Sequence, residues 1–202
     1  MSATAIVPRW EWRCFAPSVT VLAHAASIPA DAAPRESNET YILDLTGRIS
    51  QNVKIRDGVL DVKRLLQTDA EGLELWEPVL KARFPLSRTD VATVFGPWMQ
   101  SPAALTRESY TFKQLVEDTV APLPALRVIE VHKSRRGSTF AGCLAELAQI
   151  RVDSERVESF SLEHADPKRL LAALQTLGLD ARANTNYILG LKRALGLEHA
   201  VA

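Results

Sequence analysis

The sequence contains few of the residues from which metal centres and disulfide frameworks are built. Its 202 residues include two cysteines, Cys14 and Cys143, and four histidines that show no metal-ligand spacing. So few and distant cysteines give neither a zinc motif nor a disulfide framework. No apolar run approaches the roughly 20 residues of a membrane-spanning helix, and the N-terminus does not resemble a secretory signal. These absences favour a protein of the reducing cytoplasm.

An excess of charge of one sign is also missing. The 24 Lys and Arg residues balance the 24 Asp and Glu residues, so the formal net charge is zero. Bulk charge therefore predicts no membrane partner and no specific nucleic-acid partner. No Gly-, Pro- or Ser-rich stretch is long enough to be a linker, so residues 1–202 are predicted to form a single domain.

What the sequence does contain is charge that alternates with apolar residues, beginning with RWEWR at residues 9–13. In an extended strand, Arg9, Glu11 and Arg13 lie on one face, and Trp10 and Trp12 lie on the other. One face can therefore pack in a core while the other carries three charges. The same alternation returns in most of the later strand-like segments.

The segment pattern predicts an α+β fold. Short turns between successive strands favour an antiparallel sheet or barrel over parallel units. Beyond RWEWR, strands are predicted at 39–45, 52–66 (a hairpin turning at Asp57-Gly58), 76–86, 126–136, 140–152 and 156–164. Helices are predicted within 18–35 and at 87–95, 111–120, 167–177 and 184–196.

Basic residues accumulate on the charged faces of these strands. They are Arg9, Arg13, Lys54, Arg56, Lys63, Lys81, Arg83, Lys133 and Arg135. The matching acidic residues are fewer: Glu11, Asp61, Glu146 and Glu163. A solvated sheet face would mix the two signs more evenly. A closed or strongly curved sheet with this lining would bind a polyanion, because Lys and Arg clamp phosphoryl oxygens, and its carboxylates could hold a divalent cation.

The order of these motifs resembles the CYTH, or triphosphate tunnel metalloenzyme, superfamily, over roughly residues 7 to 196. RWEWR lies where that family carries its N-terminal ExExK strand. ETYILD, VKIRDG with DVK, and HKSRR resemble the family's tyrosine-containing strand, basic hairpin and later basic strand. CLAEL with ESFSLE resembles its C-terminal acidic hairpin, and NTNYILGLK resembles its closing helix.

The resemblance implies an eight-stranded antiparallel barrel with helices packed outside, whose interior binds a triphosphate and uses Mg or Mn. By matching motif positions, Glu11 and Glu146 are the expected catalytic residues, and Glu11, Glu146 and Glu163 the expected metal ligands. The expected substrate-binding residues are Arg9, Arg13, Lys54, Arg56, Lys63, Lys81, Arg83, Lys133 and Arg135. A homodimer is left open.

Two functions follow from the resemblance. The first is metal-dependent hydrolysis of inorganic tripolyphosphate or a related organic triphosphate. The second is a module that binds polyphosphate, nucleotide or another polyanion without turnover. Arg9 favours the second, because it occupies the position of the family's first Glu. Replacing a carboxylate by a cation removes a metal ligand and adds like charge.

Overall fold

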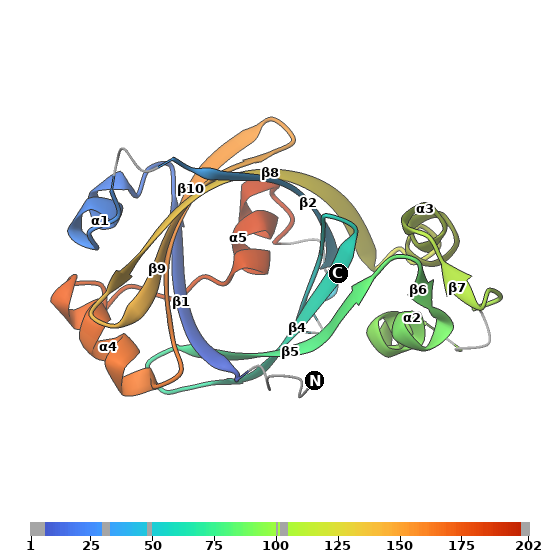
Figure 1. The fold of residues 1–202 in the computed structure, drawn as a ribbon, viewed down its shortest axis with the longest axis horizontal. Coiled ribbons are helices and arrows are strands. Elements are labelled where there is room, and N and C mark those ends of the chain that lie inside the picture. Colours follow the sequence, from blue (N-terminus) through green and yellow to red (C-terminus); the bar gives the residue numbers. More distant parts are fainter. Residues whose placement is uncertain (1–6, 30–32, 48–49, 100, 102–104, 199–202) are drawn as a thin grey trace.

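The centre of the molecule is a closed barrel of eight antiparallel strands (Figure 1). The computed structural model describes residues 7–29, 33–47, 50–99, 101 and 105–198. Around the barrel the strands follow one another in the order β1-β10-β9-β8-β2-β3-β4-β5, and β5 closes the ring against β1. The barrel strands are β1 (Arg9–Ala16), β2 (Arg35–Asp44), β3 (Gln51–Arg56), β4 (Val59–Thr68), β5 (Glu74–Arg83), β8 (Leu126–Phe140), β9 (Cys143–Val152) and β10 (Glu155–His164).

Tight turns join the consecutive strands where the sequence predicts hairpins. Asp57 and Gly58 connect β3 to β4 with φ angles of 52° and 69°. Asp153, with a φ of 51°, lies in the turn between β9 and β10. Left-handed backbone of this kind matches the twist of the flanking strands, and Asp and Gly tolerate it best. The predicted hairpins are therefore confirmed.

The helices and a small second sheet are connected to the barrel by short segments. None of the helices in the described part of the chain is long and apolar enough to cross a membrane. Capping boxes at Ser87 with Asp90 and at Thr111 with Gln114 start two of the helices at the predicted positions. These elements are α1 (Thr20–Ala25), β6 (Leu86–Ser87), α2 (Arg88–Phe95), the 3-10 turn η1 (Gly96–Trp98), β7 (Ser109–Tyr110), α3 (Phe112–Gln114), the π-helical segment η3 (Leu115–Val120), α4 (Pro167–Thr176) and α5 (Tyr187–Ala194).

Two apolar cores lie on the outer surface of the barrel. Trp10 and Trp12 of β1 are buried with residues of α1 and α4 in the first core, as the alternation in RWEWR predicts. In the second core, α2 and η3 cover the outward-facing apolar residues of β3 and β4, among them Val53 and Leu60. The barrel and its outer helices confirm the predicted α+β tunnel fold.

Helix α5 lies within the ring of strands in the view of Figure 1. Its buried residues Tyr187 and Leu191 pack with Tyr41, Val131 and other apolar residues of β2, β8 and β9. The helix approaches β1 so closely at Gly190 that an added Cβ would stand 2.2 Å from the ring of Phe15. One part of the barrel interior is therefore filled by apolar side chains, and the charged residues occupy the rest.

Candidate functional site

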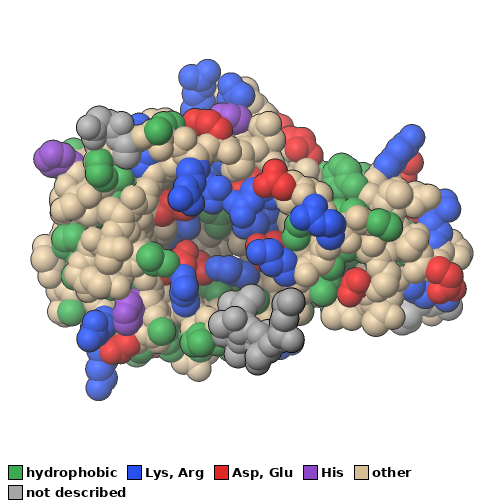
Figure 2. Space-filling model, in the orientation of Figure 1, with side chains coloured by type: hydrophobic (Ala, Val, Ile, Leu, Met, Phe, Trp, Pro, Cys, Tyr) green, Lys and Arg blue, Asp and Glu red, His purple; other side chains and the backbone are tan. Residues whose placement is uncertain are grey.

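The charged faces of the strands meet in the interior of the barrel. Figure 2 shows the opening as a hollow bordered by Lys and Arg side chains. Inside it lies a cavity of about 140 Å³. Its lining comes from seven strands and one helix: Glu11, Arg13, Tyr41, Asn52, Lys54, Asp61, Lys63, Lys133, Arg135, Glu146, Glu163 and Tyr187. The structure thus brings together most of the site residues predicted from the sequence.

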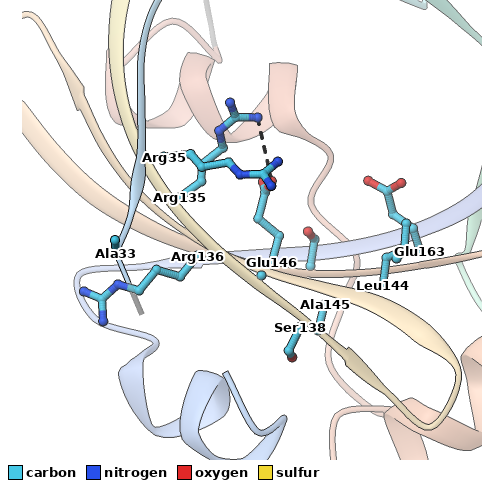
Figure 3. Close-up of a pocket in the computed structure, with 11 residues that line it drawn as sticks. Ala33, Arg35, Arg135, Arg136, Ser138, Leu144, Ala145, Glu146 and Glu163 are labelled. Carbon is cyan, nitrogen blue, oxygen red and sulfur yellow. Dashed lines mark ion pairs between the residues drawn. The ribbon is translucent and has the colours of Figure 1, made fainter. Parts of the chain in front are cut away.

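Glu146 of β9 faces three cations at once. Its carboxylate oxygens lie 3.8 Å from Arg13 Nη2, 3.8 Å from Lys133 Nζ and 4.0 Å from Arg135 Nη1; the last pair is drawn in Figure 3. Burial alone would raise the pKa of Glu146, but Lys133, Arg13 and Arg135 outweigh burial and lower it. Burial, reinforced by Arg13, lowers the pKa of Lys133 to about 8 despite the opposing pull of Glu146. Three cations face this one carboxylate, so the part of the interior around Glu146 carries surplus positive charge.

Glu11 of β1 and Glu163 of β10 are cross-strand partners and so share the inner face. Glu11 is bonded to Lys63, and Glu163 Oε2 lies 3.9 Å from Arg9 Nη1. Burial and the neighbouring charge of Glu11 raise the pKa of Glu163. The two carboxylates repel each other, and each has a basic partner that offsets part of that repulsion.

The three predicted metal ligands match a divalent cation in chemical type, since Mg and Mn prefer oxygen ligands. In the part of the chain that the structure describes, no three Asp, Glu, His or Cys side chains converge on a point where a metal ion could be held. Glu146 contacts cations instead, and Arg9 is in contact with Glu163. Mg or Mn binding by Glu11, Glu146 and Glu163 therefore stays a prediction.

Further basic residues lie in two cavities that adjoin the interior cavity. In the first, Lys54, Arg56, Lys81 and Arg83 line a space of about 280 Å³ together with Asp61, which is 3.7 Å from Lys54. Lys54 and Asp61 also line the interior cavity, so the two spaces adjoin. Lys81 and Arg83 are exposed here rather than enclosed.

A second adjoining cavity, of about 590 Å³, shares Arg135, Glu146 and Glu163 with the interior cavity. Arg35 and Arg135 extend toward Glu146 in Figure 3, whereas Arg136 extends to the opposite side of β8. Both adjoining cavities lie toward the end of the barrel at which β1 and β2 begin and β3 and β5 finish, so the basic interior opens at a basic mouth.

Sequence analysis missed two residues of the interior: Tyr187, which lines the cavity, and Glu39, which contacts Arg56 and Tyr41. Glu39 lies two residues before Tyr41 on β2, so strand alternation alone could have placed it on the inner face. Its side chain is fully buried, with Arg56 Nη1 at 3.2 Å, and it accepts hydrogen bonds from Tyr41 at 2.8 Å and Ser37 at 3.0 Å. Tyr187 enters from α5, and no strand pattern signals that.

The environment of Glu39 predicts a loss of stability in acid. Burial acts to raise its pKa, but Lys133, Lys54 and the hydrogen bonds from Tyr41 and Ser37 bring it down to about 2 from 4.5. A carboxyl with a lowered pKa in the folded state stabilises the protein above its unfolded pKa. That contribution is lost as pH falls from about 4.5 toward 2. The loss of stability amounts to about 2 kcal/mol by pH 3.

Urea unfolding at pH 6 and pH 3 measures this effect, with Glu39→Gln as the comparison. We expect the variant to be less stable at pH 6 and to lose about 2 kcal/mol less than the unsubstituted protein on acidification. Equal acid sensitivity of the two proteins would show that Glu39 is not the titrating group.

No protein-family model matches the sequence, and the search of curated proteins finds no match. Among solved structures, HpAC1 from Hippeastrum, described as an adenylyl cyclase candidate with a dominant triphosphatase activity, has a TM-score of 0.50 at 16% identity. The match covers 95% of this chain and 99% of that one. A conserved hypothetical protein from Pyrococcus furiosus has a TM-score of 0.50 at 15% identity and covers 89% of this chain and 98% of its own. The likeness confirms the tunnel fold.

Proposed function

We propose that the barrel interior binds a linear triphosphate or a similar polyphosphate anion. The observation that supports this most directly is the surplus of buried positive charge around Glu146, where Arg13, Lys133 and Arg135 share one carboxylate. Buried cations are screened little by salt and carry a desolvation cost that a phosphate group would offset. Arginine, with its planar fork of donors, suits phosphoryl oxygens in particular.

The shape of the tunnel favours a narrow, extended anion over a bulky one. The interior cavity of about 140 Å³ is small and continues into two adjoining basic cavities through shared lining residues. A phosphate chain repeats its charge along its length, so successive phosphates would contact Lys54 and Lys63 as well as Arg13 and Lys133. A single compact anion would not reach all of these basic residues at once.

Metal-dependent hydrolysis of the same anion is the second candidate function. The adjacent carboxylates of Glu11 and Glu163, with the raised pKa of Glu163, favour it because a divalent cation would relieve their repulsion. Hydrolysis would require the ion pair between Arg9 and Glu163 to open, since Arg9 already supplies positive charge there. Binding without turnover requires no such rearrangement and is therefore the better-supported function.

Calorimetric titration with tripolyphosphate, followed by phosphate release with Mg or Mn, tests both candidates. We expect binding of one tripolyphosphate per chain in metal-free buffer. The Glu11→Gln variant should bind it about three- to tenfold more tightly, because it removes a repelling charge from the cavity and releases Lys63. Glu77→Gln, whose side chain pairs with exposed Arg64, is the matched control and should change nothing.

The outcomes separate the candidates. Metal-dependent phosphate release that disappears in Glu11→Gln would establish hydrolysis. Binding without release would leave the binding function alone. If the unsubstituted protein neither binds nor cleaves tripolyphosphate, the interior is not a polyphosphate site.

A further inference from the structure

Tyr187, the first residue of α5, lies among the cations of the interior cavity. Lys133 Nζ is 4.1 Å and Arg13 Cζ is 5.1 Å from the centroid of its ring. The ring also stacks on Tyr41, at a centroid distance of 5.2 Å and an interplanar angle of 27°. The ring position is therefore fixed by contacts with residues from three different strands.

The hydroxyl group of Tyr187 has no hydrogen-bond partner among the residues that the structure describes. The residue is only 6% exposed, so bulk water does not solvate this group either. The nearby Tyr41 hydroxyl, which donates its own proton to Glu39 Oε2 at 2.8 Å, is close enough to act on the pKa of Tyr187, but the two hydroxyls do not meet the distance and angle of a hydrogen bond. A buried hydroxyl without a partner is costly and uncommon in folded proteins, and here it belongs to a residue that lines a cavity.

We propose that Tyr187 is an anion-binding residue whose hydroxyl donates a hydrogen bond to a phosphate oxygen held between Arg13 and Lys133. This inference rests on the proposed binding function. It adds a neutral donor, supplied by a helix, to the charged donors of Arg13 and Lys133, which come from strands. An acceptor placed in the cavity by the two cations would satisfy the one polar atom of Tyr187 that the protein leaves unpaired.

Tyr187 has the properties that this role requires. Burial raises its pKa, so at neutral pH the group is a protonated donor and not a phenolate. The cations near the ring withdraw electron density from it, which makes its hydroxyl a stronger donor. Neutral hydrogen-bond donors also discriminate by geometry, because they add no long-range attraction for other anions.

Helix α5 holds Tyr187 rigidly in place. Asn186 caps the helix by accepting from Leu189 N at 2.9 Å, and its amide donates to Glu74 Oε1 of β5 at 3.0 Å. Gly190 allows the helix to lie directly against Phe15. The hydroxyl is therefore preorganised before any ligand arrives, and a ligand that binds it also ties α5 to the barrel.

The Tyr187→Phe variant tests the inference, because it removes the hydroxyl and keeps the ring with its stacking and cation contacts. Tripolyphosphate affinity should fall about 10- to 100-fold, the loss of one hydrogen bond to a charged group. The melting temperature without ligand should stay the same or rise, because an unsatisfied buried group has been removed. Tripolyphosphate should slow hydrogen exchange of the α5 amides less in the variant than in the unsubstituted protein.

Tyr110→Phe is the matched control. Tyr110 is equally buried but lies outside the barrel, and its hydroxyl accepts from Arg107 N at 3.2 Å. Its variant should keep full affinity and lose stability, the reverse of the result for Tyr187→Phe.

Each other outcome would overturn the role of Tyr187. Unchanged affinity in Tyr187→Phe would show that the hydroxyl does not bind the anion, while the binding function stands. A lowered melting temperature would show that the hydroxyl is structural. Absence of tripolyphosphate binding by the unsubstituted protein would reject the binding function itself and this inference with it.

Discussion

Glu146→Gln is expected to lose about 3 kcal/mol of unfolding free energy in anion-free buffer and to recover most of it when tripolyphosphate is added. The substitution leaves Arg13, Lys133 and Arg135 without the carboxylate that faces all three. Breaking a buried ion pair by removing one partner costs about 3 to 5 kcal/mol, and the partial exposure of Glu146 places the loss at the lower end. A bound anion would replace the missing charge.

The loss of stability in Glu146→Gln should depend on pH because of Lys133. Its pKa of about 8 is held up in part by Glu146, so without that carboxylate Lys133 releases its proton more readily. A neutral Lys133 no longer needs the counter-charge. The stability difference between Glu146→Gln and the unsubstituted protein should therefore be larger at pH 6 than at pH 9.

Urea unfolding with and without tripolyphosphate measures the effect. The control is Glu77→Gln, which breaks an exposed ion pair with Arg64 and should change stability by less than about 0.5 kcal/mol. If Glu146→Gln were as stable as the unsubstituted protein, the three cations would not depend on that carboxylate.

The second large effect is expected from Arg13→Met, which should weaken tripolyphosphate binding by 100-fold or more. Arg13 is 7% exposed, and its Nη1 donates to Ser159 Oγ at 2.8 Å. The guanidinium group is thus oriented before the ligand binds. Loss of two charge-assisted hydrogen bonds to phosphate amounts to about 3 kcal/mol, which corresponds to a factor above 100.

Stability distinguishes this variant from one that is simply misfolded. Methionine has nearly the volume of the arginine stem, and Glu146 keeps Lys133 and Arg135 as partners, so the variant should stay folded with only a partial loss of stability. Arg13→Lys keeps the charge but loses the fork, so it should bind tripolyphosphate with intermediate affinity. Calorimetric titration measures all three proteins. Arg64→Met, on the outer surface of β4, should bind as the unsubstituted protein does, and equal binding by Arg13→Met would remove Arg13 from the site.

The two substitutions are expected to change the affinity for tripolyphosphate in opposite directions. Removing Glu146 takes a negative charge out of the cavity and should strengthen anion binding, whereas removing Arg13 should weaken it. Two misfolded variants would both bind weakly. Opposite changes in affinity would therefore support electrostatic recognition in the tunnel.

Much of the fold could be predicted because its signals are local. The alternation in RWEWR assigns Glu11 and Arg13 to one face of β1 and the tryptophans to the other, and the structure confirms this. Asp57-Gly58 marks the β3–β4 turn for the same reason, since left-handed backbone is a property of those residues themselves. Strand faces, hairpins and capped helix starts are determined by residues that are neighbours in the sequence.

The site depended on pairings between strands that are far apart in sequence. Glu146 of β9 meets Arg13 of β1 and Lys133 of β8 because the barrel closes in one particular order. Glu39 is on a strand that the sequence identified, but its burial against Arg56 follows from the pairing of β2 with β3. No local pattern contains that information.

The sequence by itself determined that strands with basic inner faces would be present, because side-chain alternation follows from backbone geometry alone. Only the tertiary structure decided which charges meet, and that Tyr187 enters the tunnel on α5. The reason is that α5 can occupy this position only where its residues fit the facing side chains at atomic distances. Gly190 admits the helix against Phe15, and a methyl group in its place would not fit.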